Sequence, residues 1–286
     1  MSESLAVAAV CGALVLMFEL LDAPRVRTAV GLGLVCGIAA LARAELILLA
    51  PFLVLPLLWT WRKRPRVERI SVIGAVGFGA LAVVGPWVAF NVSRFEEPTF
   101  ISTNDGIAIL GSTCDDVFFG TAIGLTNLNT CIPKQAPKGD QSQISKIYRE
   151  RALNYINDGR RTQFVKVVAA RVGRDWGVFR PADMISLNES EGRPRWLTEL
   201  GMWFYYPLAA LAIAGGVVLR RRSVRIWPLA VLPVIVTLAA VLSYGQTRFR
   251  VPAEPVIVIL AAATIAAIVN SRARGAQSTT AASSSR

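Results

Sequence analysis

Long apolar segments fill both ends of the chain, and a long, mainly polar stretch separates them. A helix needs about 20 apolar residues to span a bilayer. The apolar pattern predicts seven membrane-spanning helices, four before the polar stretch and three after it, over residues 5–21, 28–41, 46–61, 70–92, 197–219, 226–244 and 253–270. The sequence therefore predicts an all-α polytopic membrane protein with a polar insert between two groups of helices.

This pattern divides the chain into four parts. Residues 1–93 carry the first four transmembrane helices, residues 94–195 form a loop domain, residues 196–270 carry the last three helices, and residues 271–286 form a tail. The tail consists largely of Ser, Thr, Ala, Gly and Arg, a low-complexity composition that predicts a disordered segment.

The loop domain is predicted to be mixed and only partly helical. Apolar residues recur at helical spacing over residues 141–156 and 161–172, and Asp158 with Gly159 marks a break between these two helices. Residues 94–131 are rich in Gly, Asn, Asp and Thr, which predicts loop with short extended pieces.

Positive charge gathers in the short connections between apolar segments. The net charge is +12, and 53% of the residues are hydrophobic. The basic clusters at residues 62–69, 220–225 and 272–274 follow the rule that Lys and Arg mark cytoplasmic loops. They predict a multi-pass protein of the cell membrane, with the N-terminus and residues 94–195 extracytoplasmic and the C-terminus cytoplasmic. This distribution favours contact with membrane lipid and argues against nucleic acid as a partner.

The chain contains no histidine. This composition excludes histidine general bases and Ser-His-Asp triads, and it removes the commonest metal ligand. The sequence therefore indicates no metal site and no cofactor, and it leaves open whether a divalent cation binds.

Two cysteines fall within the predicted extracytoplasmic insert. Cys114 and Cys131 would lie in an oxidising compartment, where a disulfide between them is favoured over two independent thiols. The spacing alone does not determine the pairing. Cys11 and Cys36 lie in predicted spans and are interpreted as packing residues.

Three arginines lie at the predicted outer rim of the membrane. Arg43 follows the second helix, and Arg248 and Arg250 precede the last one. A guanidinium group binds two phosphate oxygens at once, and a phosphate at the membrane edge belongs to a lipid headgroup or a lipid-linked donor. The alternatives are interfacial side chains and charges that only set topology. Because outer loops are normally poor in Lys and Arg, the pattern favours a donor-phosphate site.

Three more residues are candidates for a loop over the substrate. Asn104 and Asp105 precede Gly106, and this tripeptide taken alone is typical of a plain turn. Asp105 could instead bind a sugar or order the loop over a cavity. Tyr244 opens the outer segment that carries Arg248.

Four stretches of the chain resemble the membrane-embedded GT-C glycosyltransferases of family 39, the protein mannosyltransferase-like and aminoarabinose transferase-like group, and especially its actinobacterial members. They are Gly-Ile-Ala-Ala-Leu-Ala-Arg-Ala-Glu at 37–45, Pro-Trp-Val-Ala-Phe-Asn at 86–91 leading to Phe-Ile-Ser-Thr-Asn-Asp-Gly at 100–106, Arg-Val-Gly-Arg-Asp-Trp-Gly-Val-Phe-Arg-Pro at 171–181, and Tyr-Gly-Gln-Thr-Arg-Phe-Arg-Val-Pro-Ala-Glu-Pro at 244–255. Each motif is moderately specific, and their order covers most of the chain.

The resemblance implies transfer of a sugar from a polyprenyl-phosphate donor to an extracytoplasmic glycan or protein acceptor. In such enzymes a carboxylate takes the proton of the acceptor hydroxyl and cations hold the phosphate, the role expected here for Arg43, Arg248 and Arg250. The family's catalytic acid lies in the first outer loop, and the resemblance implies that this chain begins after that loop. No residue is therefore assigned as catalytic, and Asp105 and Glu45 are the candidates on the outer face.

This gap leads to two expectations. The chain is expected to be the C-terminal portion of such an enzyme, or a half-protein whose partner supplies the N-terminal portion, and to be inactive alone. The alternative is a non-catalytic membrane subunit or scaffold of a cell-envelope glycan assembly. A transporter is disfavoured because the predicted spans are nearly free of ionisable groups.

Overall fold

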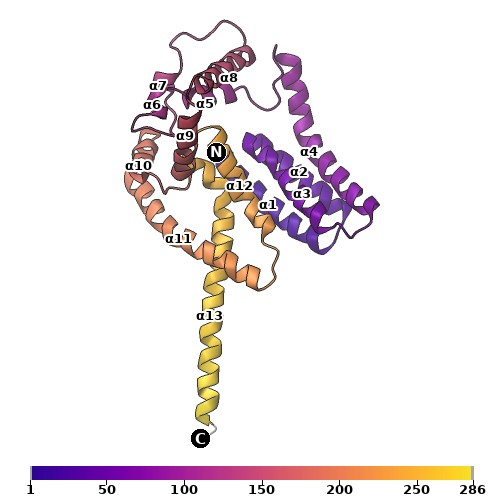
Figure 1. Ribbon diagram of the computed structural model, residues 1–286. Coiled ribbons are helices and arrows are strands. Elements are labelled where there is room, and N and C mark those ends of the chain that lie inside the picture. Colours follow the sequence, from indigo (N-terminus) through magenta and orange to yellow (C-terminus); the bar gives the residue numbers. More distant parts are fainter. Residues whose placement is uncertain (1, 285–286) are drawn as a thin grey trace. The chain divides into compact units, whose positions relative to one another are not determined.

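The computed structural model describes residues 2–284. The chain is 77% helical, and no strand occurs within these residues. The first group of helices comprises α1 (Ser2–Asp22), α2 (Val26–Ala42), the 3₁₀ helix η1 (Ala44–Leu48), α3 (Leu49–Thr60) and α4 (Arg66–Arg94). The last group comprises α11 (Arg195–Arg221), α12 (Trp227–Leu242), the 3₁₀ helix η2 (Thr247–Ala253) and α13 (Glu254–Ser284). Figure 1 shows this order along the chain.

All seven apolar segments are helical, as the pattern predicts. Four helices within the described residues are long and apolar enough to cross a membrane, over Ser2–Asp22, Arg66–Arg94, Arg195–Arg221 and Thr247–Ser271. Three further apolar helices are shorter, over Val26–Ala42, Ala44–Thr60 and Trp227–Leu242. The architecture is that of an α-helical membrane protein, and the number of seven spans stays a prediction.

The chain folds as two compact units. One contains residues 2–184 together with Val231–Pro252, and the other contains Ile185–Ala230 with the chain from Ala253 onward. In the second unit α11 packs against α13 at Gly215, where an added Cβ atom would lie 1.8 Å from the Leu260 carbonyl oxygen. All residues of the candidate site lie in the first unit.

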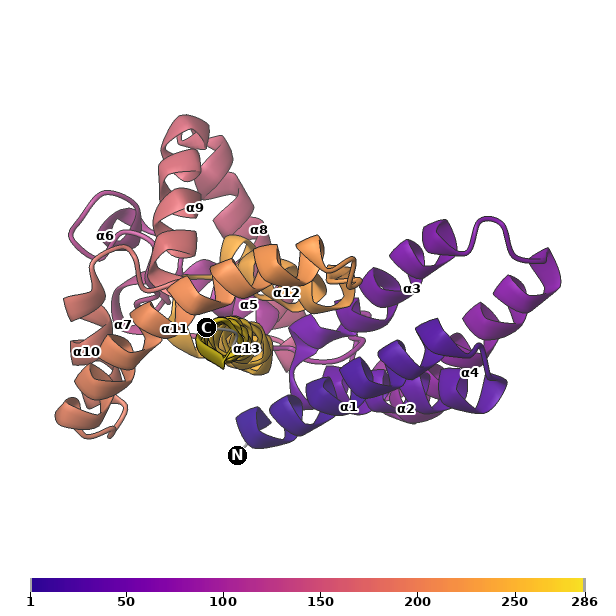
Figure 2. The same cartoon turned by 90° about the horizontal axis from the view of Figure 1, so that it is seen from below.

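Within the first unit, α2 packs between α1 and α4 (Figure 2). The approach of α2 to α4 is close because both helices place glycine at the contact. A Cβ atom added at Gly33 would lie 2.1 Å from the Val76 carbonyl oxygen, and one added at Gly79 would lie 2.4 Å from the Val30 carbonyl oxygen. Small residues allow membrane helices to pack backbone against backbone.

Replacing Gly33 by alanine is expected to destabilise the first unit by about 1–3 kcal/mol, because the new methyl group overpacks the contact and forces α2 away from α4. Gly77→Ala on α4 is the matched control, since no atom lies within 4 Å of a Cβ atom there. Unfolding in detergent, followed by circular dichroism, measures both variants. Equal stability of the two variants would contradict this account of the α2–α4 contact.

The insert is more helical than the sequence predicts. It contains α5 (Asp105–Gly111), α6 (Asp115–Phe118), α7 (Leu128–Cys131), α8 (Gln141–Asn157), α9 (Arg161–Asp175) and α10 (Pro181–Ser190). The prediction of short extended pieces in 94–131 is wrong, because short helices occupy that stretch. Helices this short depend on tertiary packing, which local composition does not report.

The two long helices of the insert begin and end near their predicted bounds. Asp140 caps α8 in a capping box with Gln143, and the stop before α9 is Gly159, whose φ of 72° favours glycine. In the structure α13 continues to Ser284, into the predicted tail, whose disorder stays a prediction. The extension has no nucleation cost, and alanine favours the helix. The last two residues of that predicted tail, 285 and 286, lie outside the described residues.

Candidate functional site

A pocket of about 590 Å³ lies where the insert meets η1, the end of α12 and η2. Apolar side chains form much of its wall. Its charged and aromatic lining residues are Glu45, Asp105, Arg149, Phe100, Tyr244 and Phe249. Ligand pockets typically have this size and combine apolar walls with a few polar groups.

Asp105 is fixed in the pocket by α8. Its Oδ1 atom accepts a 2.8 Å hydrogen bond from the Ser145 hydroxyl, and its Oδ2 atom accepts one from the Arg149 guanidinium. The same Ser145 hydroxyl accepts a 3.1 Å hydrogen bond from the Gly106 amide. Both oxygens of Asp105 therefore have donors, and Asp105 has a defined orientation.

Glu45 reaches the pocket from η1 and is held by Arg43. The Arg43 Nε atom donates to Oε1 of Glu45 at 2.5 Å, and its Nη1 atom donates to the Arg248 carbonyl oxygen at 3.0 Å. The Arg43 guanidinium also lies over the Phe249 ring, 5.5 Å from the centroid. Arg43 thus joins the start of η1 to η2, two segments more than 200 residues apart in sequence.

The predicted arginine cluster is only partly assembled. Arg248 lies beside Arg43 and forms a 3.4 Å ion pair with Glu3. Arg250 is buried, with 9% of its surface exposed. Arg43, Arg248 and Arg250 do not line the pocket, whereas the predicted residues Asn104, Asp105 and Tyr244 do.

Two features of the site were not predicted. Ser145 and Arg149 lie one helical turn apart on α8, and this spacing was the available signal because it places both on one face. The tripeptide Asn104–Gly106 does not form an isolated turn. It begins α5, since Asn104 is the residue before its first turn.

The buried Arg171 of α9 attaches the insert to α12. Arg171 donates from Nη1 to the Val241 carbonyl oxygen at 3.0 Å and from Nη2 to the Ser112 carbonyl oxygen at 2.8 Å. Burial lowers the pKa of Arg171 to about 10, which leaves it charged at neutral pH. Because Val241 immediately precedes pocket residue Leu242, this contact fixes one wall of the pocket.

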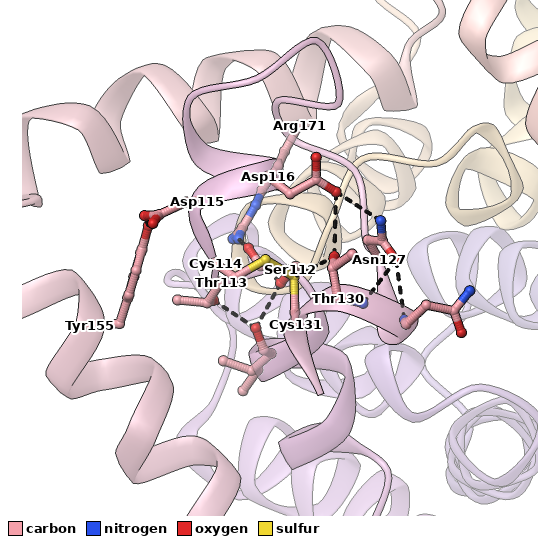
Figure 3. The surroundings of a disulfide bond; sticks show 12 residues. Ser112, Thr113, Cys114, Asp115, Asp116, Asn127, Thr130, Cys131, Tyr155 and Arg171 are labelled. Carbon is pink, nitrogen blue, oxygen red and sulfur yellow. Dashed lines mark hydrogen bonds between the residues drawn. A yellow bond between two sulfur atoms is a disulfide. The ribbon is translucent and has the colours of Figure 1, made fainter. Parts of the chain in front are cut away.

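The disulfide between Cys114 and Cys131 joins the start of α6 to the end of α7, with 5.4 Å between the Cα atoms. Figure 3 shows it beside Ser112 and the Arg171 side chain. Within the loop that it closes, the Gly124 carbonyl oxygen accepts a 2.8 Å hydrogen bond from the Gly245 amide. The disulfide loop therefore contacts the residue that follows Tyr244.

Within residues 2–284, no group of three or more His, Cys, Asp or Glu side chains could hold a metal ion. The charged groups available at the pocket are carboxylates and guanidinium groups. Comparisons of the chain with models of protein families, with characterised proteins and with solved structures found no match.

Proposed function

We propose that the chain takes part in transferring a sugar from a polyprenyl-phosphate donor to a glycan or protein acceptor at the extracytoplasmic surface of the cell membrane. One observation carries the proposal: a pocket beside apolar helix ends contains two carboxylates, and each is held by an arginine. A carboxylate and a cation are the two groups that this reaction requires at the reacting centre.

The proposed reaction balances with these groups. The acceptor hydroxyl loses its proton to a carboxylate, and its oxygen forms a bond to the anomeric carbon of the donor. The bond between that carbon and the phosphate oxygen breaks, and the electron pair stays on the phosphate. Negative charge therefore grows on the phosphate, where a fixed guanidinium group stabilises the transition state more than the ground state.

Glu45 fits the role of proton acceptor better than Asp105. Both oxygens of Asp105 accept hydrogen bonds, from Ser145 and Arg149. Glu45 uses Oε1 for Arg43, and its Oε2 atom accepts no hydrogen bond from the residues that the structure describes. We assign Asp105 to positioning Arg149, and Glu45 to the proton transfer.

Arg149 is the guanidinium group that lines the pocket, so we assign it to the donor phosphate. Arg43 pairs with Glu45 and adds positive charge beside the pocket. The Arg248 carbonyl oxygen accepts a hydrogen bond from Arg43 and so helps to position it. Arg250 has no direct part in this assignment because it is buried away from the pocket lining.

The proposal includes an orientation. Seven spans with residues 62–69, 220–225 and 272–274 in the cytoplasm place the insert outside, together with Glu45 and Tyr244. A polyprenyl-phosphate headgroup lies at this membrane surface, and the apolar pocket wall, with Ile47 and Leu242, suits its first isoprene units.

Arg149→Ala is expected to weaken binding of undecaprenyl phosphate by about 10- to 150-fold, because one charge-assisted hydrogen bond contributes about 1.5–3 kcal/mol. The control is Arg151→Ala, which removes an exposed arginine two residues along α8. Binding isotherms of the protein in nanodiscs give the comparison. If the two variants bind alike, the pocket is not the phosphate site.

Glu45→Gln separates binding from chemistry. This variant is expected to keep undecaprenyl-phosphate affinity, while sugar transfer from a polyprenyl-phosphate hexose to an acceptor falls by about 100- to 10,000-fold. The assay uses membranes in which the wild-type chain supports transfer. Donor binding with no transfer attributable to the wild-type chain would favour a non-catalytic subunit over an enzyme.

A further inference from the structure

A second cavity shares the segment 98–104 with the first pocket. Its volume is about 300 Å³, and residues of α4, of this segment and of the start of α8 line it. Thr99 and residues 101–104 line both this cavity and the first pocket. A third hollow of about 440 Å³, lined by Ala44 of the first pocket and Trp87 of the second cavity, lies beside both.

The cavity exists because α4 is longer than α2. The face of α4 that contacts α2 at Val76 continues toward Arg94 through Trp87 and Asn91, which recur at three- or four-residue spacing. α2 ends at Ala42, so it does not extend beside the final turns of α4 on that face.

The segment 98–104 folds back over this free face. The Trp87 indole donates a 2.9 Å hydrogen bond to the Ile101 carbonyl oxygen, and the buried Asn91 amide donates to the Phe100 carbonyl oxygen at 3.2 Å. Two side chains of α4 therefore hold the segment by its backbone. Residues of the segment line both cavities.

The lining of the second cavity differs chemically from that of the first pocket. It contains aromatic rings, hydroxyl and amide groups and the cation Arg94, and no carboxylate. The Arg94 guanidinium lies 5.7 Å from the ring centroids of Phe90 and Phe95, and it forms no ion pair within the described residues. Within the described residues, the Asn104 side chain likewise forms no hydrogen bond.

This combination matches one class of ligand. An exposed indole offers a flat apolar face to a sugar ring, and Trp87 has 45% of its surface exposed. Amides and hydroxyls provide partners for sugar hydroxyls, and a guanidinium group without an ion pair favours a negatively charged substituent. The volume is at the lower end of the range for ligand pockets, which suits a single sugar ring.

We propose that this second cavity binds a negatively charged sugar unit of the acceptor, with Trp87 as the stacking surface and Arg94 as the charge partner. The inference rests on the proposed function, because it divides donor and acceptor between two cavities that share the segment 98–104. A sugar bound beside this segment would lie close to the first pocket, which contains Glu45 and Asp105.

The test compares D-glucuronate with D-glucose as probes, using saturation-transfer NMR on the protein in nanodiscs. Wild type is expected to bind glucuronate at least 10-fold more tightly than glucose. Arg94→Gln should remove this preference, while Trp87→Ala should weaken the binding of both sugars. Trp87→Phe keeps an aromatic face but loses the hydrogen bond to Ile101, so it should retain more affinity than Trp87→Ala.

Trp196→Ala and Arg151→Gln are the controls, because both remove exposed side chains that line none of the three cavities. They should leave both affinities unchanged. Loss of binding in every variant, or equal affinity of wild type for the two sugars, would overturn the inference.

A competing explanation is that Trp87 and Arg94 only anchor α4 at the membrane surface. In that case neither sugar binds, while insertion into nanodiscs depends on phosphatidylglycerol and on Arg94, and the inference fails. Undecaprenyl-phosphate binding distinguishes this failure from failure of the proposed function. If that ligand binds and depends on Arg149 while glucuronate does not bind, only the acceptor assignment falls.

Discussion

Replacing Arg174 by methionine is expected to lower the free energy of unfolding of the first unit by about 1–3 kcal/mol. The Arg174 side chain has 0% of its surface exposed and forms an ion pair with Asp183 at 3.1 Å. Its Nε atom donates to the Ile123 carbonyl oxygen at 2.6 Å, and Nη2 donates to the Thr121 carbonyl oxygen at 3.1 Å. Methionine keeps most of the volume but removes these donors. Arg180 still donates to the Thr121 carbonyl oxygen and pairs with Asp183, so the Ile123 carbonyl oxygen is the acceptor that loses most.

The effect comes from the buried acceptors more than from the ion pair. Asp183 is partly exposed and keeps its ion pair with Arg180 at 3.0 Å, whereas a buried carbonyl oxygen that loses its donor stays desolvated without a hydrogen bond. Desolvation also lowers the pKa of Arg174, which shows that its surroundings already disfavour the charge. The carboxylate and carbonyl partners offset that cost only while the guanidinium is present.

Arg161→Met on the same helix is the matched control. Its side chain is exposed and donates only to the Asn157 side chain, so the expected change is within about 0.5 kcal/mol. Unfolding in detergent, followed by circular dichroism, measures both variants. A loss of stability at Arg174 no larger than at Arg161 would show that the buried contacts do not hold the insert together.

Replacing Cys114 and Cys131 together by serine is expected to destabilise the insert by about 3 kcal/mol. The disulfide closes a loop with a sequence separation of 17 residues, and a loop near this length gives about that stabilisation. Both cysteines also pack against the buried cluster of Val117, Phe118 and Val167, so loosening α6 and α7 exposes apolar surface.

Cys11→Ser is the control, because that thiol is exposed and not in a disulfide. Non-reducing mass spectrometry after alkylation establishes the pairing, and unfolding with and without reductant measures its contribution. Reductant should lower the stability of wild type and leave the double serine variant unchanged. If reductant affects both proteins equally, the stabilisation comes from elsewhere.

The sequence by itself determined the elements whose signals are local. Apolar runs predicted the seven helical segments, and the spacing of apolar residues predicted α8 and α9 close to their bounds, with the break at Gly159. Turn residues misled at Asn104–Gly106, since the same residues can begin a short helix. The polar composition of 94–131 likewise hid α5, α6 and α7, because such short helices form only when tertiary contacts bury one face.

Only the tertiary structure decided the composition of the site. Arg149 meets Asp105 across a separation of 44 residues, and Arg43 meets the Arg248 carbonyl across 205, pairings to which no local pattern points. The burial of Arg174 depends in the same way on contacts between residues far apart in sequence. The cavity beside Trp87 depends on α4 extending beyond α2 and on the segment 98–104 folding back over α4. Helix formation is governed by residues three and four positions apart, whereas a pocket is formed by residues that meet only after the helices have packed.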